Sequence, residues 1–309
     1  MQRFAVVSRL GGKLVAAGAC ALVLAACSGS VNTLGSLGGS SGEGQGDKGI
    51  NAGPSLGGTK QELCTKPTVS ASPMRRLTHH EYGNAVRDLL GPSAKLPALT
   101  ADTQPELFDT MADQSLSSLL ADEYVNAAGD LADGIADINA VVGCAPGKAS
   151  EACVRDFIAR FGRRAFRRPL TGEESTRLST LYESARTAAD TSTAVRAVVA
   201  AVLASPHFLF RPEWGGEKTK LANALTVAPY EMATRLSFLL WSSVPDDVLL
   251  DAAEDGELET PAQLTAQAER MLKDPRGRSA NYNFYKQWFG LSLLDTATKN
   301  PDVYPNFDD

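Results

Sequence analysis

The chain contains few of the residues that build metal and redox sites. Among its 309 residues are only 5 cysteines and 3 histidines. His79 and His80 are adjacent, and adjacent side chains diverge by about 100° on a helix, so the two cannot bind one ion in the usual i, i+4 manner. His207 follows Ser-Pro in an expected turn, where a backbone group commonly satisfies the ring. We therefore predict no metal site and no cofactor.

The chain also lacks a long apolar segment and an excess of positive charge. Its most apolar stretch, 14–26, has 13 residues, whereas a membrane-spanning helix needs about 20. The formal net charge is −6, from 30 basic and 36 acidic side chains. An acidic chain is a poor ligand for the phosphates of a nucleic acid. The sequence thus argues against a membrane-spanning protein and against a nucleic-acid partner.

The apolar stretch closes with the lipobox Leu24-Ala25-Ala26-Cys27, and three basic residues precede it within the first 13 positions. This is the pattern of a bacterial lipoprotein signal peptide. We expect residues 1–26 to be removed and Cys27 to carry lipid, such as palmitate, that holds the protein to a membrane. An uncleaved signal anchor is the alternative, and the short apolar stretch argues against it. The expected location is the exported side of the cell envelope, at the inner or the outer membrane.

The composition of the next segment, 27–63, predicts a disordered tether. From Ser28 to Lys60 it has 11 glycines and 6 serines in 33 residues, with no apolar periodicity. A flexible chain of this length has ends about 30 Å apart on average. The tether lets the folded part stand away from the membrane.

The cysteines that remain after export and lipidation suggest one disulfide. Cys20 leaves with the signal peptide and Cys27 takes lipid, and an exported protein keeps its remaining pairs oxidised. Cys144 and Cys153 are nine positions apart and form the natural pair. Cys64 is then left over, with no partner assigned.

Helical periodicity dominates the rest of the chain. Thr78 with Glu81, and Thr171 with Glu174, have the spacing of capping boxes that begin helices. No convincing alternation and no two-residue hairpin turn accompanies the apolar stripes, so the predicted fold class is all-α, a multi-helix array. The expected helices span 75–91, 120–143, 154–166, 171–185, 195–203, 232–240, 247–254, 261–273 and 276–290. We group them into three helical domains, 64–143, 144–212 and 222–309.

Several ordered motifs in this helical region resemble those of a known family. They are Arg75 to Thr78 with Glu81-Tyr82 and Val86 to Gly91, then Phe161 to Thr171, Ser205 to Arg211, and Arg235 to Trp241 with Pro245-Asp246-Asp247. Over residues 74–309 they resemble, in order, three domain types of the large PSD-type proteins of planctomycetes and myxobacteria.

The resemblance implies architecture and no settled reaction, because these are domains of unknown function associated with planctomycete cytochrome c-like modules. The chain has no Cys-x-x-Cys-His motif, so covalent haem c is not expected. Relatives usually continue into further domains, so we expect the third domain to be truncated.

Arginines crowd the helix expected at 154–166 and the residues that follow it. Arg163, Arg164, Arg167 and Arg168 are candidates for binding an acidic polymer, a phosphate or the carboxylates of a partner. The alternative is a set of ion pairs within the chain, for which 36 acidic side chains are available. Arg235, beside another apolar stripe, allows the same two interpretations.

Two other groups of residues have both a functional and a structural interpretation. Asp246 and Asp247 are candidate ligands or acid/base groups, but they also suit the start of a helix, whose dipole favours negative charge. Tyr285, Trp288 and Phe289, together with Trp241, offer rings on which sugars can stack. Their spacing matches core faces of helices, and we predict that they belong to the core.

The sequence contains no nucleophile with a visible base, and we assign no catalytic residue. We therefore expect a lipid-anchored envelope protein that binds or scaffolds a polysaccharide or an envelope protein. The alternative is part of an envelope oxidoreductase or degradative enzyme that works with a cytochrome-like partner or with missing domains.

Overall fold

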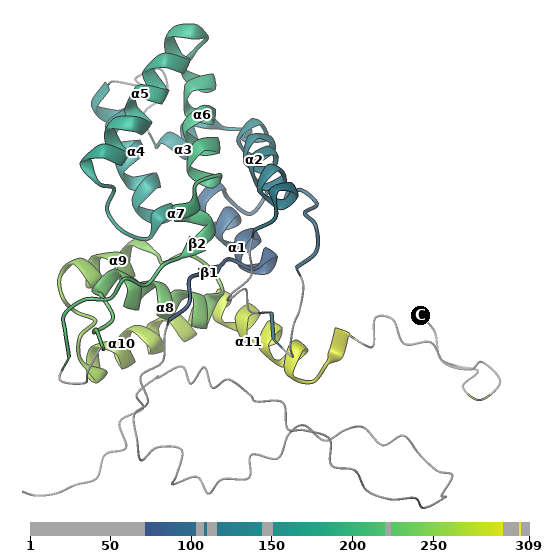
Figure 1. Ribbon diagram of the computed structural model, residues 1–309, viewed down its shortest axis with the longest axis vertical. Helices are drawn as coiled ribbons and strands as arrows, with labels where there is room; N and C mark the ends of the chain where they lie inside the picture. Colours follow the sequence, from purple (N-terminus) through teal and green to yellow (C-terminus); the bar gives the residue numbers. More distant parts are fainter. Residues whose placement is uncertain are drawn as a thin grey trace, which may run out of the picture. The chain divides into compact units, whose positions relative to one another are not determined.

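The computed structural model describes the helical part of the chain (Figure 1). The described residues are 72–102, 108–109, 116–143, 151–219, 224–292 and 303. The predicted signal peptide, Cys27, the tether, Cys64 and Cys144 lie outside them. The expectations on lipidation and on the disulfide therefore remain predictions.

Within the described residues the fold is all-α, as predicted, with one short pair of strands. In chain order the elements are β1 (Arg75–Arg76), α1 (His79–Leu90), α2 (Ser118–Asp133), α3 (Ile138–Val142), α4 (Glu151–Phe166), α5 (Gly172–Ala188), α6 (Thr191–Leu203), α7 (Pro206–Leu209), β2 (Phe210–Arg211), α8 (Pro229–Trp241), α9 (Asp247–Glu254), α10 (Pro261–Leu272) and α11 (Pro275–Trp288).

Both predicted capping boxes are present. Thr78 Oγ1 accepts a hydrogen bond from Glu81 N at 3.1 Å, and Glu81 Oε2 accepts one from Thr78 N at 2.9 Å. Thr171 and Glu174 make the same reciprocal pair at the start of α5. Each pair satisfies two backbone donors that the first helical turn leaves free, so the sequence specifies these helix starts locally.

The single helix expected over 120–143 is instead two helices. α2 ends at Asp133, and the Gly134 N–H bonds back to Asp130 O at 2.9 Å. Asp137 then caps α3, because its Oδ1 accepts hydrogen bonds from the amides of Asn139 and Ala140. The apolar period runs through both helices, but the local cap restarts the backbone.

The strand pair was not predicted from the sequence, because each strand has only two residues. β1 and β2 are antiparallel, with Arg75 opposite Arg211 and Arg76 opposite Phe210. Two residues are too few for alternation to be visible. The pair joins the start of α1 to the end of α7, which are far apart in the sequence.

A first core cluster is formed by α1 to α7, and Phe238 of α8 also belongs to it. Figure 1 shows α4, α5 and α6 side by side above α1 and α7. Its fully buried members include Tyr82, Tyr124, Phe157, Val198 and Phe208. The described residues of the first two predicted helical domains, 64–143 and 144–212, therefore share one core.

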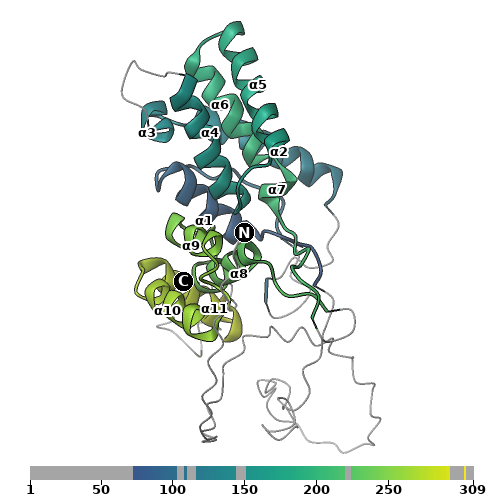
Figure 2. The ribbon, with the colours of Figure 1, turned by 90° about the vertical axis from the view of Figure 1, so that its left-hand side faces the viewer.

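A second core cluster lies among α8, α9 and α10, which Figure 2 shows grouped with α11. It contains Ala233, Leu236, Trp241, Leu249 and Met271. None of the described helices has both the length and the apolar character needed to cross a bilayer.

Candidate functional site

Arg163 joins α4 to α9 through an ion-pair cluster. Its Nη2 lies 2.7 Å from Asp251 Oδ1 and 2.9 Å from Glu254 Oε2. Both carboxylates are more than half exposed, whereas the Arg163 side chain is 19% exposed. A ligand at Arg163 would have to compete with these two carboxylates.

Arg168 is held by a carboxylate of the next helix. Its Nη1 and Nη2 donate to Glu174 Oε2 and Oε1 at 2.9 and 2.8 Å, which is bidentate geometry. The hydrogen bond from Arg168 lowers the pKa of Glu174 to about 2. His207 Nε2 lies 3.3 Å from the same carboxylate, at Oε1.

Arg167 is buried and bonds to backbone carbonyls. Nη2 donates to His207 O at 2.7 Å and Phe210 O at 2.6 Å, and Nη1 donates to Ala165 O and Phe208 O at 3.1 Å. These bonds tie the end of α4 to α7 and β2. Arg167 thus supports the fold from inside.

Arg164 differs from the other three arginines. Its Nε is buried and has no hydrogen-bond partner among the described residues.

Arg235 pairs with Glu213 through two hydrogen bonds, the shorter at 2.5 Å. Arg163, Arg168 and Arg235 are therefore ion-paired within the chain, as the ion-pair interpretation predicts. Arg167 differs from that interpretation, because its partners are backbone carbonyls.

Asp246 and Asp247 lie at the start of α9, as their structural interpretation predicts. Asp246 is the N-cap of α9, and its Oδ1 accepts from Leu249 N at 3.0 Å. Its carboxylate also accepts from both terminal nitrogens of Arg270, the closer at 2.7 Å. Asp247 is exposed in the first turn. The described part of the chain holds no group of three or more residues that could bind a metal ion.

A buried polar cluster surrounds the start of α1. Asp102 accepts hydrogen bonds from Arg76 Nη2 at 2.7 Å and from the His79 backbone at 2.6 Å. The His79 ring lies 3.2 Å from Asp102 Oδ1, and burial lowers its pKa. Arg76 also bonds to the hydroxyl of Tyr124. Sequence reasoning missed Asp102, because it lies in a loop 26 residues from Arg76 with no motif around it.

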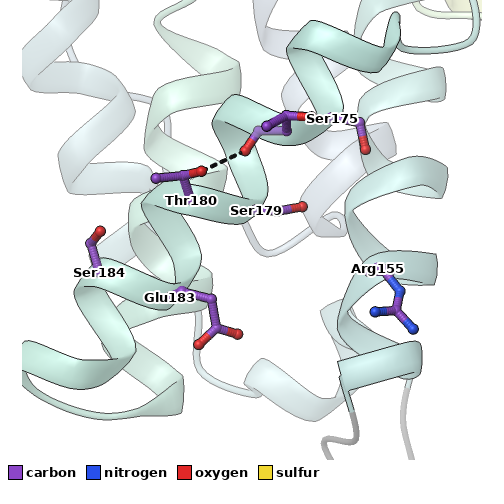
Figure 3. A pocket seen from close by; sticks show the side chains of 7 residues that line it. Arg155, Ser175, Ser179, Thr180, Glu183 and Ser184 are labelled. Carbon is purple, nitrogen blue, oxygen red and sulfur yellow. Dashed lines mark hydrogen bonds between the residues drawn. The ribbon is translucent and has the colours of Figure 1, made fainter.

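A shallow groove of about 490 Å³ runs between α4 and α5 (Figure 3). Figure 3 shows the side chains of Ser179 and Glu183 directed toward the α4 side, where Arg155 lies. The Thr180 hydroxyl donates a 2.9 Å hydrogen bond to Thr176 O within the helix. The groove presents hydroxyl groups but brings no catalytic pair together. The lining residues are Arg155, Ser175, Thr176, Ser179, Thr180, Glu183 and Ser184.

The prediction that the aromatic residues are core is correct for Trp241 and wrong for the other three. Trp241 is 1% exposed, its Nε1 donates to Met271 O at 2.9 Å, and the Arg276 guanidinium lies 3.6 Å from its ring centroid. Five aromatic side chains of α11 and its C-cap form instead an exposed surface, called here the aromatic face. They are Tyr282 (65% exposed), Phe284 (44%), Tyr285 (48%), Trp288 (53%) and Phe289 (65%).

The rings of the aromatic face contact one another. The planes of Tyr285, Trp288 and Phe289 lie within 8 to 15° of parallel, with centroids 5.7 to 6.1 Å apart. Phe108 stacks on Phe284 with centroids 5.3 Å apart. Asp109 N donates to Gln287 Oε1 at 2.7 Å. The core assignment failed because spacing shows which residues share a face, and does not show whether anything covers it.

The described residues define an all-α protein in which Arg163, Arg167, Arg168 and Arg235 bind partners within the chain and the aromatic face is exposed. Residues 75–136 match the PSD3 family (DUF1587), 153–213 match PSD5 (DUF1595) and 227–309 match PSD4 (DUF1592), each described as a protein of unknown function. The chain is thus a PSD-type multidomain protein, as its motifs suggested. Neither a curated protein nor a solved structure matches it.

Proposed function

We propose that this chain is a lipid-anchored protein of the cell envelope that works as a binding or scaffolding component. The observation that carries the binding role is the aromatic face of α11. Monomeric proteins rarely leave several large apolar side chains contiguous on their surface, and such patches mark interaction sites. The lipobox that ends at Cys27 supports the anchor.

Fatty-acid labelling in cells tests the anchor. The wild-type chain incorporates labelled palmitate and sediments with membranes, because Cys27 carries the lipid. Cys27→Ala loses the label and leaves the membrane fraction. The outcome that contradicts the anchor is continued labelling of this variant.

Binding to isolated envelopes tests the docking role. The full chain carrying Cys27→Ala, purified without lipid, sediments with washed envelope fragments. The added pair Trp288→Ala and Phe289→Ala abolishes this sedimentation, whereas Trp214→Ala, at a site that is 78% exposed on the loop before α8, does not. Equal sedimentation of all three proteins removes the aromatic face as a docking surface.

Two measurements on the same purified chain bear on its chemistry and covalent structure. A scaffold has a featureless visible spectrum and no stoichiometric metal, so a bound metal or chromophore would contradict a purely binding role.

We also propose that Cys144 and Cys153 form a disulfide. They should then resist alkylation until reduced, and free thiols at both positions would refute the bridge.

A further inference from the structure

We propose that the aromatic face of α11 binds an anionic lipid surface, with the C-terminal half of the helix lying in the plane of the membrane interface. This inference rests on the proposed function and names the partner of the same surface. It assigns to the chain a second membrane contact, separate from the lipid at Cys27.

The first argument is that the C-terminal half of α11 contributes no buried residue to a core. The last buried residue of the helix is Ala280, and none of residues 281–292 is buried. Its contacts with the rest of the chain include the stacking of Phe284 on Phe108 and the hydrogen bond that Gln287 Oε1 accepts from Asp109 N. Most helical stability in proteins comes from packing an apolar face. This half-helix presents its apolar face outward.

The second argument is the distribution of side chains around the helix. At 100° per residue, the five aromatic residues fall within an arc of about 160°, bounded by Phe284 and Tyr282. Lys286, Asn283 and Gln287 occupy the opposite side. A wide aromatic arc against a polar, basic arc is the pattern of helices that lie in a membrane interface. Tryptophan and tyrosine in particular favour the headgroup level.

The third argument is charge. α11 carries Arg276, Arg278 and Lys286 and no acidic residue, in a chain whose net charge is −6. Arg276 is engaged with Asp274 and Asp88. Arg278 is exposed and lies on the same side of the helix as the aromatic arc, one turn before Tyr282. A basic helix on an acidic protein orients that helix toward anionic headgroups and the rest of the chain away from them.

The same observations weigh against a glycan or a second copy of the chain. The rings of Tyr285, Trp288 and Phe289 are stacked in parallel at about 6 Å, so they cover part of the flat faces on which a sugar would stack. A second copy carries the same net charge of −6, which opposes its approach. A lipid interface accepts rings in any orientation.

Vesicle sedimentation tests the proposal with the full chain carrying Cys27→Ala. Vesicles of phosphatidylcholine with phosphatidylglycerol should bind the protein, and pure phosphatidylcholine vesicles should bind it more weakly. Trp288→Ala with Phe289→Ala should weaken partitioning at least about tenfold, because both side chains insert apolar area. Trp214→Ala is the matched control and should bind like the parent.

Arg278→Glu tests the contribution of charge. This substitution should weaken binding to the anionic vesicles and leave binding to the neutral vesicles unchanged. Circular dichroism of each variant shows whether the fold is retained. Binding that is equal for anionic and neutral vesicles, or unaffected by the aromatic substitutions, overturns the proposal.

Two further measurements separate this inference from the proposed function. If envelopes bind the chain through the aromatic face but vesicles do not, the lipid proposal is wrong and the docking role stands. Binding to purified envelope polysaccharide, or concentration-dependent dimerisation that Trp288→Ala abolishes, would then identify the partner. If neither envelopes nor vesicles bind, both proposals fall.

Discussion

Arg167 shows how much of this fold depends on single polar side chains. It has a left-handed backbone, with φ of 59°, and is 3% exposed. Burial and the neighbouring charge of Arg211 lower its pKa. It is nevertheless retained in the charged form that four carbonyl acceptors require, since arginine stays protonated in proteins. A backbone of this kind normally selects glycine, so the side chain must compensate for the strain.

Replacing Arg167 therefore destabilises the protein by two separable terms. Arg167→Ala should cost about 3 kcal/mol or more, because buried carbonyls lose their donor. Arg167→Gly should cost about 1 kcal/mol less than alanine, because glycine adopts positive φ freely. Arg177→Ala, which removes an exposed 3.8 Å ion pair to Glu173, should change stability by less than about 0.5 kcal/mol. Urea denaturation measures all three. Equal costs for alanine and glycine would refute the strain term.

Glu174 makes the stability depend on acid. Its pKa falls from the ordinary 4.5 to about 2 in the folded protein, chiefly through the hydrogen bond from Arg168. A depressed folded pKa contributes stability that is fully present above pH 4.5 and is lost as the pH falls toward 2.

Glu174→Gln should accordingly lower stability at pH 7 and flatten its dependence between pH 4.5 and 2. The free energy of unfolding, measured across that window, tests this. Glu173→Gln at the adjacent exposed position is the control and should follow the wild type. An unchanged slope in Glu174→Gln would mean that Arg168 does not stabilise the carboxylate.

Among the elements, α8 begins differently from α1, α5 and α10. Those three helices start with a Thr side chain in a capping box. Ala228 is the N-cap of α8 and has no side-chain acceptor. Glu231 compensates in part, since its carboxylate accepts hydrogen bonds from the amides of Ala228 at 3.0 Å and Trp214 at 2.6 Å. No N-cap side chain accepts a hydrogen bond from an amide of the first turn of α8, and a hydroxyl at position 228 would supply that acceptor.

Ala228→Ser should stabilise the protein by about 0.5 to 1 kcal/mol. The backbone of Ala228 is extended, with φ of −67° and ψ of 152°, which is the conformation of a serine N-cap. Thr171→Ala at the start of α5 should cost about 1 kcal/mol and serves as the reverse control. Thermal denaturation of the three proteins measures the shifts. No gain from serine would show that Glu231 already satisfies this helix start.

At the scale of the whole molecule, α8 connects the two core clusters. Phe238 lies in the first cluster, whereas Leu236 and Trp241 of the same helix lie in the second. Asp88 of α1 adds a polar link, accepting from Ser243 Oγ at 2.7 Å and from Arg276 Nη1 at 3.1 Å. The three matched family segments thus meet in one connected structure.

We predict a single cooperative unfolding transition that depends on Phe238. Phe238→Ala removes a ring that is 5% exposed and should cost about 3 to 5 kcal/mol. The next residue, Leu239, is 56% exposed, and Leu239→Ala should cost much less. Calorimetry should give equal calorimetric and van't Hoff enthalpies for the wild type. Two resolved transitions in the wild type would contradict coupling through α8.

The parts of the fold that were predictable depend on neighbours in the sequence. Capping residues at Thr78 and Thr171 and the apolar stripe of α6 specify helices through contacts within a few positions. The break at Gly134 was missed because the apolar period continues across it. The contact of Asp102 with Arg76 and His79 was unpredictable for the opposite reason, since no local pattern accompanies a loop residue that pairs over long range.

The sequence by itself determined the helical class, the family motifs and the expectation of a lipid at Cys27, because each is encoded in short stretches of residues. Only the tertiary structure decided which apolar faces are covered. Trp241 and Trp288 each follow an aromatic residue by three positions, Phe238 and Tyr285, yet Trp241 lies in a core and Trp288 is exposed. Burial depends on what packs against a face, and that partner comes from elsewhere in the chain or from outside it.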